Sequence, residues 1–207
     1  KYIDAIRKAG LIPREEFKLS ALRTLCSTGS PLSAEAFKFV YEAIQPNLQL
    51  ASISGGTDIV GCFVLGCPVL PVFAGEIQVR GLGMDVAVLN DDGQKISGKQ
   101  GELCCLSPFI SMPIGFWNDD DGQKYKEAYF AHFQDVWRHG DWATLTENYG
   151  VIIHGRSDAT LNPGGVRIGT AEIYRIVEAL DDVTEALVID KAFADDVRII
   201  LFVRLAD

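Results

Sequence analysis

The stretch GRSDATLNPGGVRIGTAEI, residues 155–173, divides the sequence into two parts with different apolar patterns. It holds Asp, Asn, Pro and several glycines, which interrupt regular secondary structure, and two arginines, Arg156 and Arg167. Guanidinium groups bind phosphates and ribose oxygens well, but surface arginines paired with nearby carboxylates give the same pattern. The stretch therefore indicates either a ligand-binding loop or a polar surface connection.

The residues after this stretch predict one helix and two strands. Thr170 is a candidate helix cap, and four apolar residues follow at helical spacing: Ile173, Ile176, Val177 and Leu180. The segments TEALVID (184–190) and VRIILFVRL (197–205) read as strands joined by a short loop. About fifty residues are little for an independent core, so we expect residues 158–207 to be the hinge and the truncated start of a small α+β C-terminal domain.

The residues before it, 71–157, have the texture of a β-rich subdomain. Short apolar segments separated by turn residues predict antiparallel strands or a small barrel, in GEIQVR (75–80), MDVAVLN (84–90), GELCCL (101–106), VWRHGDWATL (136–145) and GVIIHGR (150–156). One helical stretch, residues 124–131, lies between them.

Residues 1–70 predict the end of an α/β subdomain. Apolar residues fall on one helical face over residues 33–44, and strand candidates flank this helix at LRTLCS (22–27) and LQLASIS (48–54). Strand, helix and strand in this order favour a parallel sheet. The predicted fold class is therefore α/β plus a β-rich subdomain, followed by the start of a small α+β C-terminal domain.

Composition restricts the function. The 207 residues are 48% hydrophobic, with 28 acidic and 19 basic residues and a net charge of −9. No Lys/Arg cluster could follow a phosphate backbone, and no apolar run is as long as a membrane helix, so we expect neither nucleic acid nor a membrane as partner. Five cysteines without CxxC spacing predict reduced core or strand thiols. We expect a soluble, cytoplasmic protein.

Two short loops are candidate ligand sites. SGGTD (54–58) follows a strand, and its glycines would let the backbone approach a phosphate while Thr57 and Asp58 offer a hydroxyl and a carboxylate for magnesium. A simple tight turn is the alternative. STGSP (27–31) also follows a strand, and its amides could face an anion or a purine edge. Capping of the following helix is the alternative there.

HGDW (139–142) places Asp141 at a glycine that interrupts a strand pattern. A carboxylate in such a place is suited to accept hydrogen bonds from a ribose diol, although Asp is also a common turn residue.

Taken together and in order, these motifs resemble the adenylate-forming superfamily of acyl-CoA synthetases, adenylation domains and luciferases. STGSP resembles its adenine-side segment, SGGTD its Gly-x-Thr-Glu motif with Asp58 in place of Glu, and HGD its ribose motif. GELCC (101–105) resembles its GEL strand, and residues 155–173 resemble its hinge motif GRxDxxxxxxGxRIxxxEI. The resemblance covers nearly the whole chain.

The resemblance implies roles around ATP or AMP and a magnesium ion. Thr57 would contact the α-phosphate, and Asp58, one methylene shorter than the family's Glu, would help to hold Mg²⁺. Residues expected to line the nucleotide, the first three on its adenine side, are Gly29, Ser30, Pro31, Ser54, Gly55 and Gly56.

The later motifs carry further implied roles. Asp141 would bind the ribose hydroxyls, Arg156 the ribose or phosphate side, and Arg167, which acts with Thr57 and Asp58 in catalysis, the phosphate. Asp158 would be the hinge about which the C-terminal domain rotates between the two half-reactions. The residues expected to border the pantetheine tunnel of coenzyme A are Gly164 and Gly165.

The implied activity is that of an ATP-dependent acid-thiol ligase, in which a carboxylate attacks the α-phosphate and coenzyme A then displaces AMP. Some wider segments resemble in particular the members that act on acetoacetate: LCSTGSPLS (25–33), SISGGTD (52–58), GEIQVRGLGM (75–84) and FWNDDDGQKY (116–125).

The family's phosphate loop and catalytic lysine would fall before residue 1 and after residue 207, so we expect this chain alone to be inactive. Two alternatives remain: a synthetase for another small acyl group, and a non-catalytic nucleotide-binding module.

Overall fold

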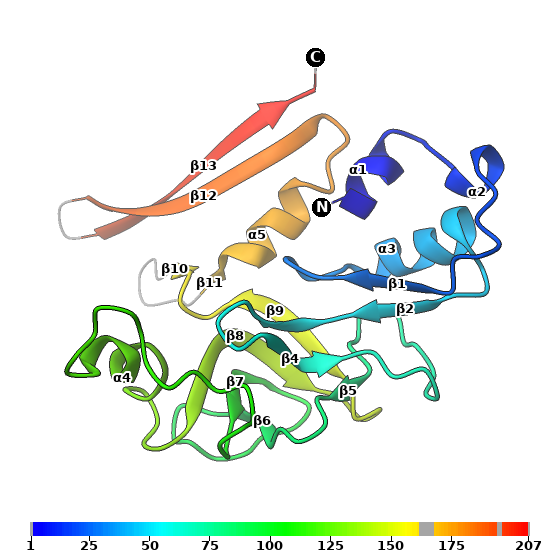
Figure 1. The fold of residues 1–207 in the computed structure, drawn as a ribbon. Helices are drawn as coiled ribbons and strands as arrows, with labels where there is room; N and C mark the ends of the chain where they lie inside the picture. The colour runs from blue at the N-terminus through cyan, green and yellow to red at the C-terminus, as the bar shows by residue number, and fades with distance from the viewer. Residues whose placement is uncertain (1, 162–167, 194–195, 207) are drawn as a thin grey trace. The chain divides into compact units, whose positions relative to one another are not determined.

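The computed structural model describes residues 2–161, 168–193 and 196–206 (Figure 1). The chain forms two compact units. Unit 1 consists of Lys1–His139 and Ala143–Ile153, and unit 2 consists of Gly140–Trp142 and His154–Asp207. The division into 1–70, 71–157 and 158–207 stays a prediction.

Unit 1 begins with the predicted α/β arrangement. Helices α1 (Tyr2–Lys8) and α2 (Pro13–Glu16) precede strand β1 (Thr24–Ser27), helix α3 (Ala34–Phe39) and strand β2 (Gln49–Ser52). Strands β1 and β2 pair in parallel, with Ser27 opposite Ser52, so the predicted parallel pairing is confirmed.

The helix predicted over residues 33–44 consists of an α-helical segment followed by a π-helical one. Ser33 caps α3 by accepting a hydrogen bond from Ala36 N at 3.2 Å, and the chain then continues as a π-helix, η1 (Val40–Ile44). The π-helix is closed by a bond from Gln45 N to Val40 O at 3.0 Å. Apolar residues three and four apart fit both helix types, so periodicity did not reveal the change.

The rest of unit 1 is β-rich. Strands β3 (Ser54–Gly56), β4 (Gly61–Leu65) and β5 (Val79–Arg80) form one sheet, in that order. Strands β6 (Val86–Leu89), β7 (Gln100–Cys105), β8 (Trp137–Leu145) and β9 (Val151–Arg156) form a second, and helix α4 (Gln123–Tyr129) lies between β7 and β8 in the chain. Residues 75–80 were predicted as one strand, but only Val79 and Arg80 are strand and Ile77 makes an isolated bridge to Val151.

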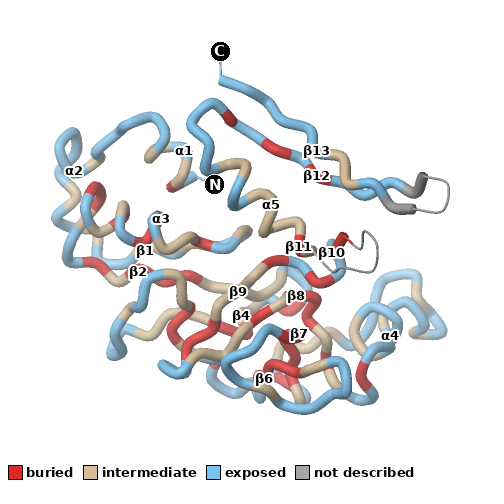
Figure 2. Tube along the Cα trace, turned by 180° about the vertical axis from the view of Figure 1, so that it is seen from behind, coloured by how far each residue is buried: buried red, intermediate tan, exposed pale blue. Residues whose placement is uncertain are grey.

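Two large apolar clusters and a smaller third one form the core of unit 1, and their strands carry many of the buried positions drawn in red in Figure 2. The first lies under α3 and β2 and includes Phe37, Val40 and Leu50. The second lies within the β-rich part and includes Phe63, Leu103 and Trp137. Fully burying a large apolar side chain stabilises a fold by about 1.5–3 kcal/mol, so these clusters provide the main stabilisation of the candidate site's framework.

Unit 2 contains the short strands β10 (Thr160–Leu161) and β11 (Ile168–Gly169), which pair antiparallel, and helix α5 (Thr170–Val177). Its long hairpin consists of β12 (Val183–Phe193) and β13 (Asp196–Leu205), which confirms the two predicted strands. The Tyr174 hydroxyl accepts a hydrogen bond from Val188 N at 3.0 Å, so α5 packs on β12.

Two details of α5 differ from the prediction. Gly169, rather than Thr170, is the capping residue, and no side chain caps the helix. Ile176 and Leu180, two of the four apolar residues that indicated the helix, are 67% and 58% exposed. The helix ends at Val177, before the last apolar residue of the pattern.

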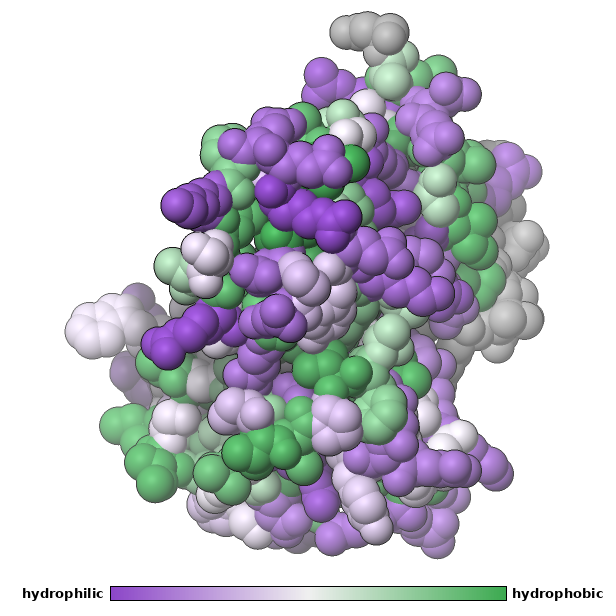
Figure 3. Space-filling model, turned by 90° about the vertical axis from the view of Figure 1, so that its right-hand side faces the viewer, coloured by the Kyte–Doolittle hydropathy of each residue, from purple (hydrophilic) through white to green (hydrophobic). Residues whose placement is uncertain are grey.

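Apolar side chains also reach the surface, where green patches alternate with purple polar areas on the face shown in Figure 3. Exposed apolar residues of the β12–β13 hairpin include Leu187, Phe202 and Leu205. The cysteines are free thiols, as predicted; Cys104 and Cys105 are buried on β7, whereas Cys26 on β1 is an exposed strand residue. None of the described helices has the length and hydrophobicity that crossing a lipid bilayer requires.

Candidate functional site

The loop at residues 27–31 and the hairpin after β2 begin at the same edge of the parallel strand pair. Ser27 and Ser52 are register partners, and Ile53 N donates to Ser27 O at 2.9 Å. Thr28, Gly29 and Pro31 are exposed, and Ser30 is half-buried. Since ligands of α/β sheets bind at the carboxyl ends of parallel strands, this edge has the right location for a binding loop. Helix capping was the alternative role for this loop, but the residue that caps the following helix is Ser33, which lies outside residues 27–31.

The SGGTD motif is a β-hairpin rather than an open loop. Its first three residues are strand β3, and Thr57 and Asp58 begin the turn that leads to β4. The turn is closed by a bond from Val60 N to Thr57 O at 3.3 Å, and Val60 has φ 47°, a rare value for a β-branched residue. The turn alternative is therefore correct as local structure, and it leaves Thr57 and Asp58 exposed.

Gly55 and Gly56 of this hairpin each have a close neighbour, which is backbone for Gly55 and a side chain for Gly56. A Cβ on Gly55 would lie 2.1 Å from Gly61 O and 2.6 Å from Cys62 Cα, on the paired strand. A Cβ on Gly56 would lie 2.0 Å from Asp58 Oδ1. The glycine pair thus allows the hairpin to close and the Asp58 carboxylate to lie over Gly56.

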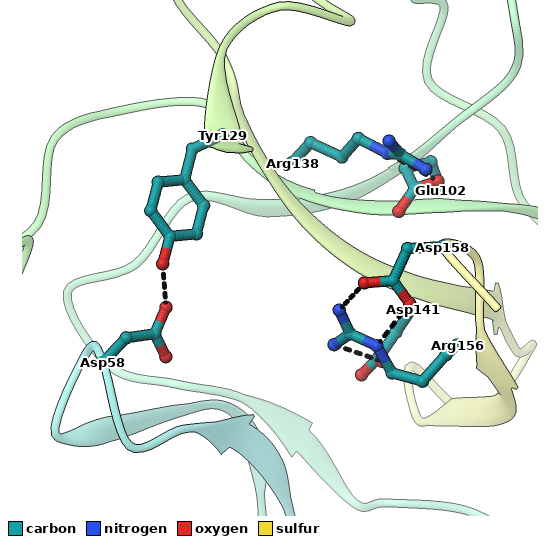
Figure 4. A network of polar contacts seen from close by, with 7 residues as sticks. All are labelled: Asp58, Glu102, Tyr129, Arg138, Asp141, Arg156 and Asp158. Carbon is teal, nitrogen blue, oxygen red and sulfur yellow. Dashed lines mark hydrogen bonds and ion pairs between the residues drawn. The ribbon is translucent and has the colours of Figure 1, made fainter. Parts of the chain in front are cut away.

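The Asp58 carboxylate also contacts an aromatic residue distant in sequence. The Tyr129 hydroxyl donates a hydrogen bond to Asp58 Oδ2 at 2.6 Å (Figure 4). The Tyr129 ring stacks on the buried Trp137 ring, with centroids 3.6 Å apart and planes inclined by 15°. The turn carboxylate is therefore connected to the core of unit 1 through an aromatic stack.

Within unit 2, the HGD motif and the first residues of the hinge motif meet. Arg156 Nη1 lies 3.3 Å from Asp141 Oδ1, and the Arg156 guanidinium also contacts the Asp158 carboxylate through Nε at 2.9 Å and through Nη2 (Figure 4). The Asp141 side chain is 9% exposed, whereas those of Arg156 and Asp158 are 48% and 55% exposed. The sequence suggested either ligand binding by Arg156 or its pairing with nearby carboxylates, and the structure shows the pairing.

Gly140 is what allows this arrangement. It has φ 85°, and a Cβ there would lie 2.5 Å from Arg156 Nη2. Its carbonyl accepts a hydrogen bond from Ser157 N at 2.8 Å. Asp141 lies within strand β8, so the alternative of a turn aspartate is wrong.

No protein-family model matches the chain. Comparison with known sequences does find relatives. The chain is 63% identical over 206 residues to the acetoacetyl-coenzyme A synthetase of Rhizobium meliloti (strain 1021). It is 46% identical over 209 residues to the acetoacetyl-CoA synthetase of Xenopus tropicalis. Each alignment covers 100% of this chain and 32% or 31% of the relative.

Over its whole length, the chain is homologous to acetoacetyl-CoA synthetases.

Solved structures agree with this assignment. The acetoacetyl-CoA synthetase from Streptomyces lividans matches 99% of the chain with a TM-score of 0.86 at 44% identity, and the chain covers 31% of that protein. The anthranilate CoA ligase AuaEII, solved in complex with anthranoyl-AMP, matches 98% of the chain with a TM-score of 0.72 at 20% identity, a similarity of fold. The fold is thus part of an adenylate-forming synthetase with mixed α/β sheets, and the chain spans about one third of its relatives' length.

Some residues predicted for an acetoacetyl-CoA synthetase site cannot be placed. Gly164, Gly165 and Arg167 lie outside the described residues. Among the residues that are described, no group of three or more His, Cys, Asp or Glu side chains is arranged to hold a metal ion. Magnesium in nucleotide sites is commonly held by one or two carboxylates together with the substrate's phosphates, and the exposed Asp58 fits that mode.

Two residues that form polar contacts near the candidate motifs, Glu102 and Tyr129, were not singled out from the sequence. Glu102, in the GEL strand, is 3% exposed and lies 3.1 Å from Arg138 Nε, so a buried carboxylate is neutralised by the neighbouring strand. Tyr129 was seen only as part of a helical stretch. The spacing of Tyr125 and Tyr129, four residues apart on one helix face, was the signal that an aromatic cluster forms there.

Proposed function

We propose that the protein is an AMP-forming acetoacetate–CoA ligase, which converts acetoacetate, ATP and coenzyme A to acetoacetyl-CoA, AMP and pyrophosphate. The main support is the 63% identity to an acetoacetyl-coenzyme A synthetase over 206 residues. The chain covers 32% of that relative, so the activity is proposed for the protein that contains this segment.

The nucleotide would bind at the carboxyl edge of β1 and β2, where it would contact the motifs STGSP (27–31) and SGGTD (54–58). Gly29, Ser30 and Pro31 would line the adenine, and Thr57 would donate from the exposed turn to the α-phosphate. Their location is consistent with anion binding, because loops at this edge of a parallel sheet present backbone amides. Ser54 to Gly56 would shape the hairpin beneath the phosphates.

Asp58 would hold magnesium together with the phosphates of ATP. A carboxylate offers about four lone-pair positions, so the hydrogen bond from Tyr129 to Oδ2 does not exhaust its capacity. The ion, when bound, would neutralise charge that develops on the phosphates.

In unit 2, Asp141 would accept hydrogen bonds from the ribose hydroxyls, and Arg156 would bind the ribose or phosphate side. Arg156 would then exchange part of its contact with Asp141 or Asp158 for the ligand. Asp158, in the turn after β9, would serve as the hinge of the C-terminal domain, and residues 158–207 would form its first part.

An assay of the complete reading frame tests the proposal. AMP formation in the presence of ATP, Mg²⁺ and coenzyme A is compared for acetoacetate, acetate and longer acids. We expect acetoacetate to give the highest kcat/KM. Preference for another acid would assign a different acyl group, and nucleotide binding without AMP formation from any acid would indicate a non-catalytic module.

A further inference from the structure

The contact between Asp58 and Tyr129 joins two residues that are 71 positions apart. Asp58 is exposed on the β3–β4 turn, where a side chain without a partner would sample several rotamers. Tyr129 is the last residue of α4, and its hydroxyl donates to Asp58 Oδ2 at 2.6 Å. A hydrogen bond to an ionised acceptor is stronger than one between neutral groups, so this contact restricts the carboxylate.

The Tyr129 hydroxyl is itself held in place. Its ring stacks on Trp137, which is 2% exposed, and the Phe116 and Tyr125 rings pack against it edge-on, with centroids 5.6 and 5.5 Å away. Stacked and edge-on ring contacts fix the orientation of an aromatic side chain. The donor therefore approaches Asp58 from a defined direction.

The other carboxylate oxygen lies close to the backbone of Gly56. Asp58 Oδ1 occupies the space over Gly56, where a Cβ would lie only 2.0 Å away. The Asp58 carboxylate thus lies between the Tyr129 hydroxyl and the backbone of Gly56. Both contacts lie within unit 1.

We propose that Tyr129 is a positioning residue for Asp58: it holds the carboxylate in one orientation, in which the carboxylate meets the magnesium ion of a bound nucleotide. This inference rests on the proposed function. Aspartate has a shorter arm than glutamate and reaches fewer positions, and a fixed donor that orders it before the nucleotide arrives lowers the cost of ordering it on binding.

The test uses the complete protein and the variant Tyr129→Phe, which keeps the stacked ring and removes only the hydroxyl. Calorimetry measures the affinity for ATP with excess Mg²⁺ and with EDTA. We expect the affinity with Mg²⁺ to fall about three- to tenfold, since the lost bond is charge-assisted but lies at an exposed carboxylate. The affinity with EDTA should be unchanged, because the hydroxyl acts only through Asp58 and the metal.

Tyr125→Phe is the matched control. It removes a phenol hydroxyl from the same aromatic cluster, where that hydroxyl donates to the carbonyl of Pro113 instead of to Asp58. We expect its Mg²⁺-dependent affinity to equal that of the wild type. Equal losses in the two variants would show a general effect on packing and overturn the inference.

A double-mutant cycle with Asp58→Ala completes the test. If Tyr129 acts through Asp58, Tyr129→Phe has no further effect once the carboxylate is absent. An effect of the same size in both backgrounds would overturn the positioning role. The proposed function is tested by the wild-type protein alone: it is wrong if that protein does not bind ATP or form AMP, whatever the variants show.

Discussion

The Gly140→Ala substitution should destabilise unit 2 by two separable mechanisms. Gly140 has φ 85°, and an L-residue in the left-handed region costs about 1–2 kcal/mol. The added Cβ would also lie 2.5 Å from Arg156 Nη2, which contacts Asp158, so the guanidinium, whose Nη1 contacts Asp141, must shift. Because the Asp141 side chain is 9% exposed and that of Arg156 is 48% exposed, losing their contact should cost about 1–2 kcal/mol, less than for a fully buried pair.

Urea unfolding of the chain measures the sum, which we expect to be about 2–4 kcal/mol in the free energy of unfolding. Hydrogen exchange of the Ser157 amide, which donates to Gly140 O, locates the loss. Gly98→Ala is the matched control, since Gly98 has φ 68° and no atom within 4 Å of the added Cβ. It should show only the backbone cost, about 1–2 kcal/mol.

The cycle with Arg156→Ala isolates the second mechanism. Without the guanidinium, the new methyl group has no charged group to displace, and Gly140→Ala should cost about 1–2 kcal/mol, as Gly98→Ala does. The same cost of Gly140→Ala with and without Arg156 would refute the argument that Gly140 is required by the guanidinium.

Three further predictions follow from single groups. In the complete enzyme, Asp158→Pro should slow coenzyme A-dependent AMP release more than pyrophosphate exchange, because fixing φ at a hinge restricts rotation; equal losses would exclude the hinge role. Burial, together with the nearby Glu102 carboxylate, raises the pKa of Cys104 to about 12, so iodoacetamide at pH 8 should alkylate the exposed Cys26 first and leave Cys104 unmodified in peptide mass spectrometry. Burial lowers the pKa of His154, so the unfolded state binds its proton more readily and stability should fall as pH drops below about 6.5; the His154→Gln variant should lose less stability over the same range.

Local features of the fold could be predicted from the sequence because neighbours in the chain determine them. Apolar periodicity and small-residue loops gave the order of β1, α3 and β2, and parallel pairing followed from the intervening helix. The β12–β13 hairpin was predicted for the same reason, since two apolar runs flank a short connection.

Tertiary contacts could not be predicted in the same way. The buried Gln78 side chain donates to the carbonyls of Cys67, Leu70 and Pro71 and accepts from Cys67 N, and nothing in its neighbouring sequence indicates this role. The partner of Asp58 is equally remote in the chain. Such contacts depend on how distant elements pack, which propensity and spacing do not encode.

The glycines of the candidate motifs illustrate why a motif by itself does not demonstrate a ligand site. Gly55 is required by the backbone of the paired strand, whereas the Asp58 carboxylate lies against Gly56 and the Arg156 guanidinium against Gly140. Each of these close contacts is intramolecular, so each exists whether or not a nucleotide binds. Ligand binding therefore depends on the groups that the glycines make room for. Two of those groups are charged and at least partly exposed, Asp58 and Arg156, and a charge that a fold places and orients near its surface is available to a phosphate or its metal ion.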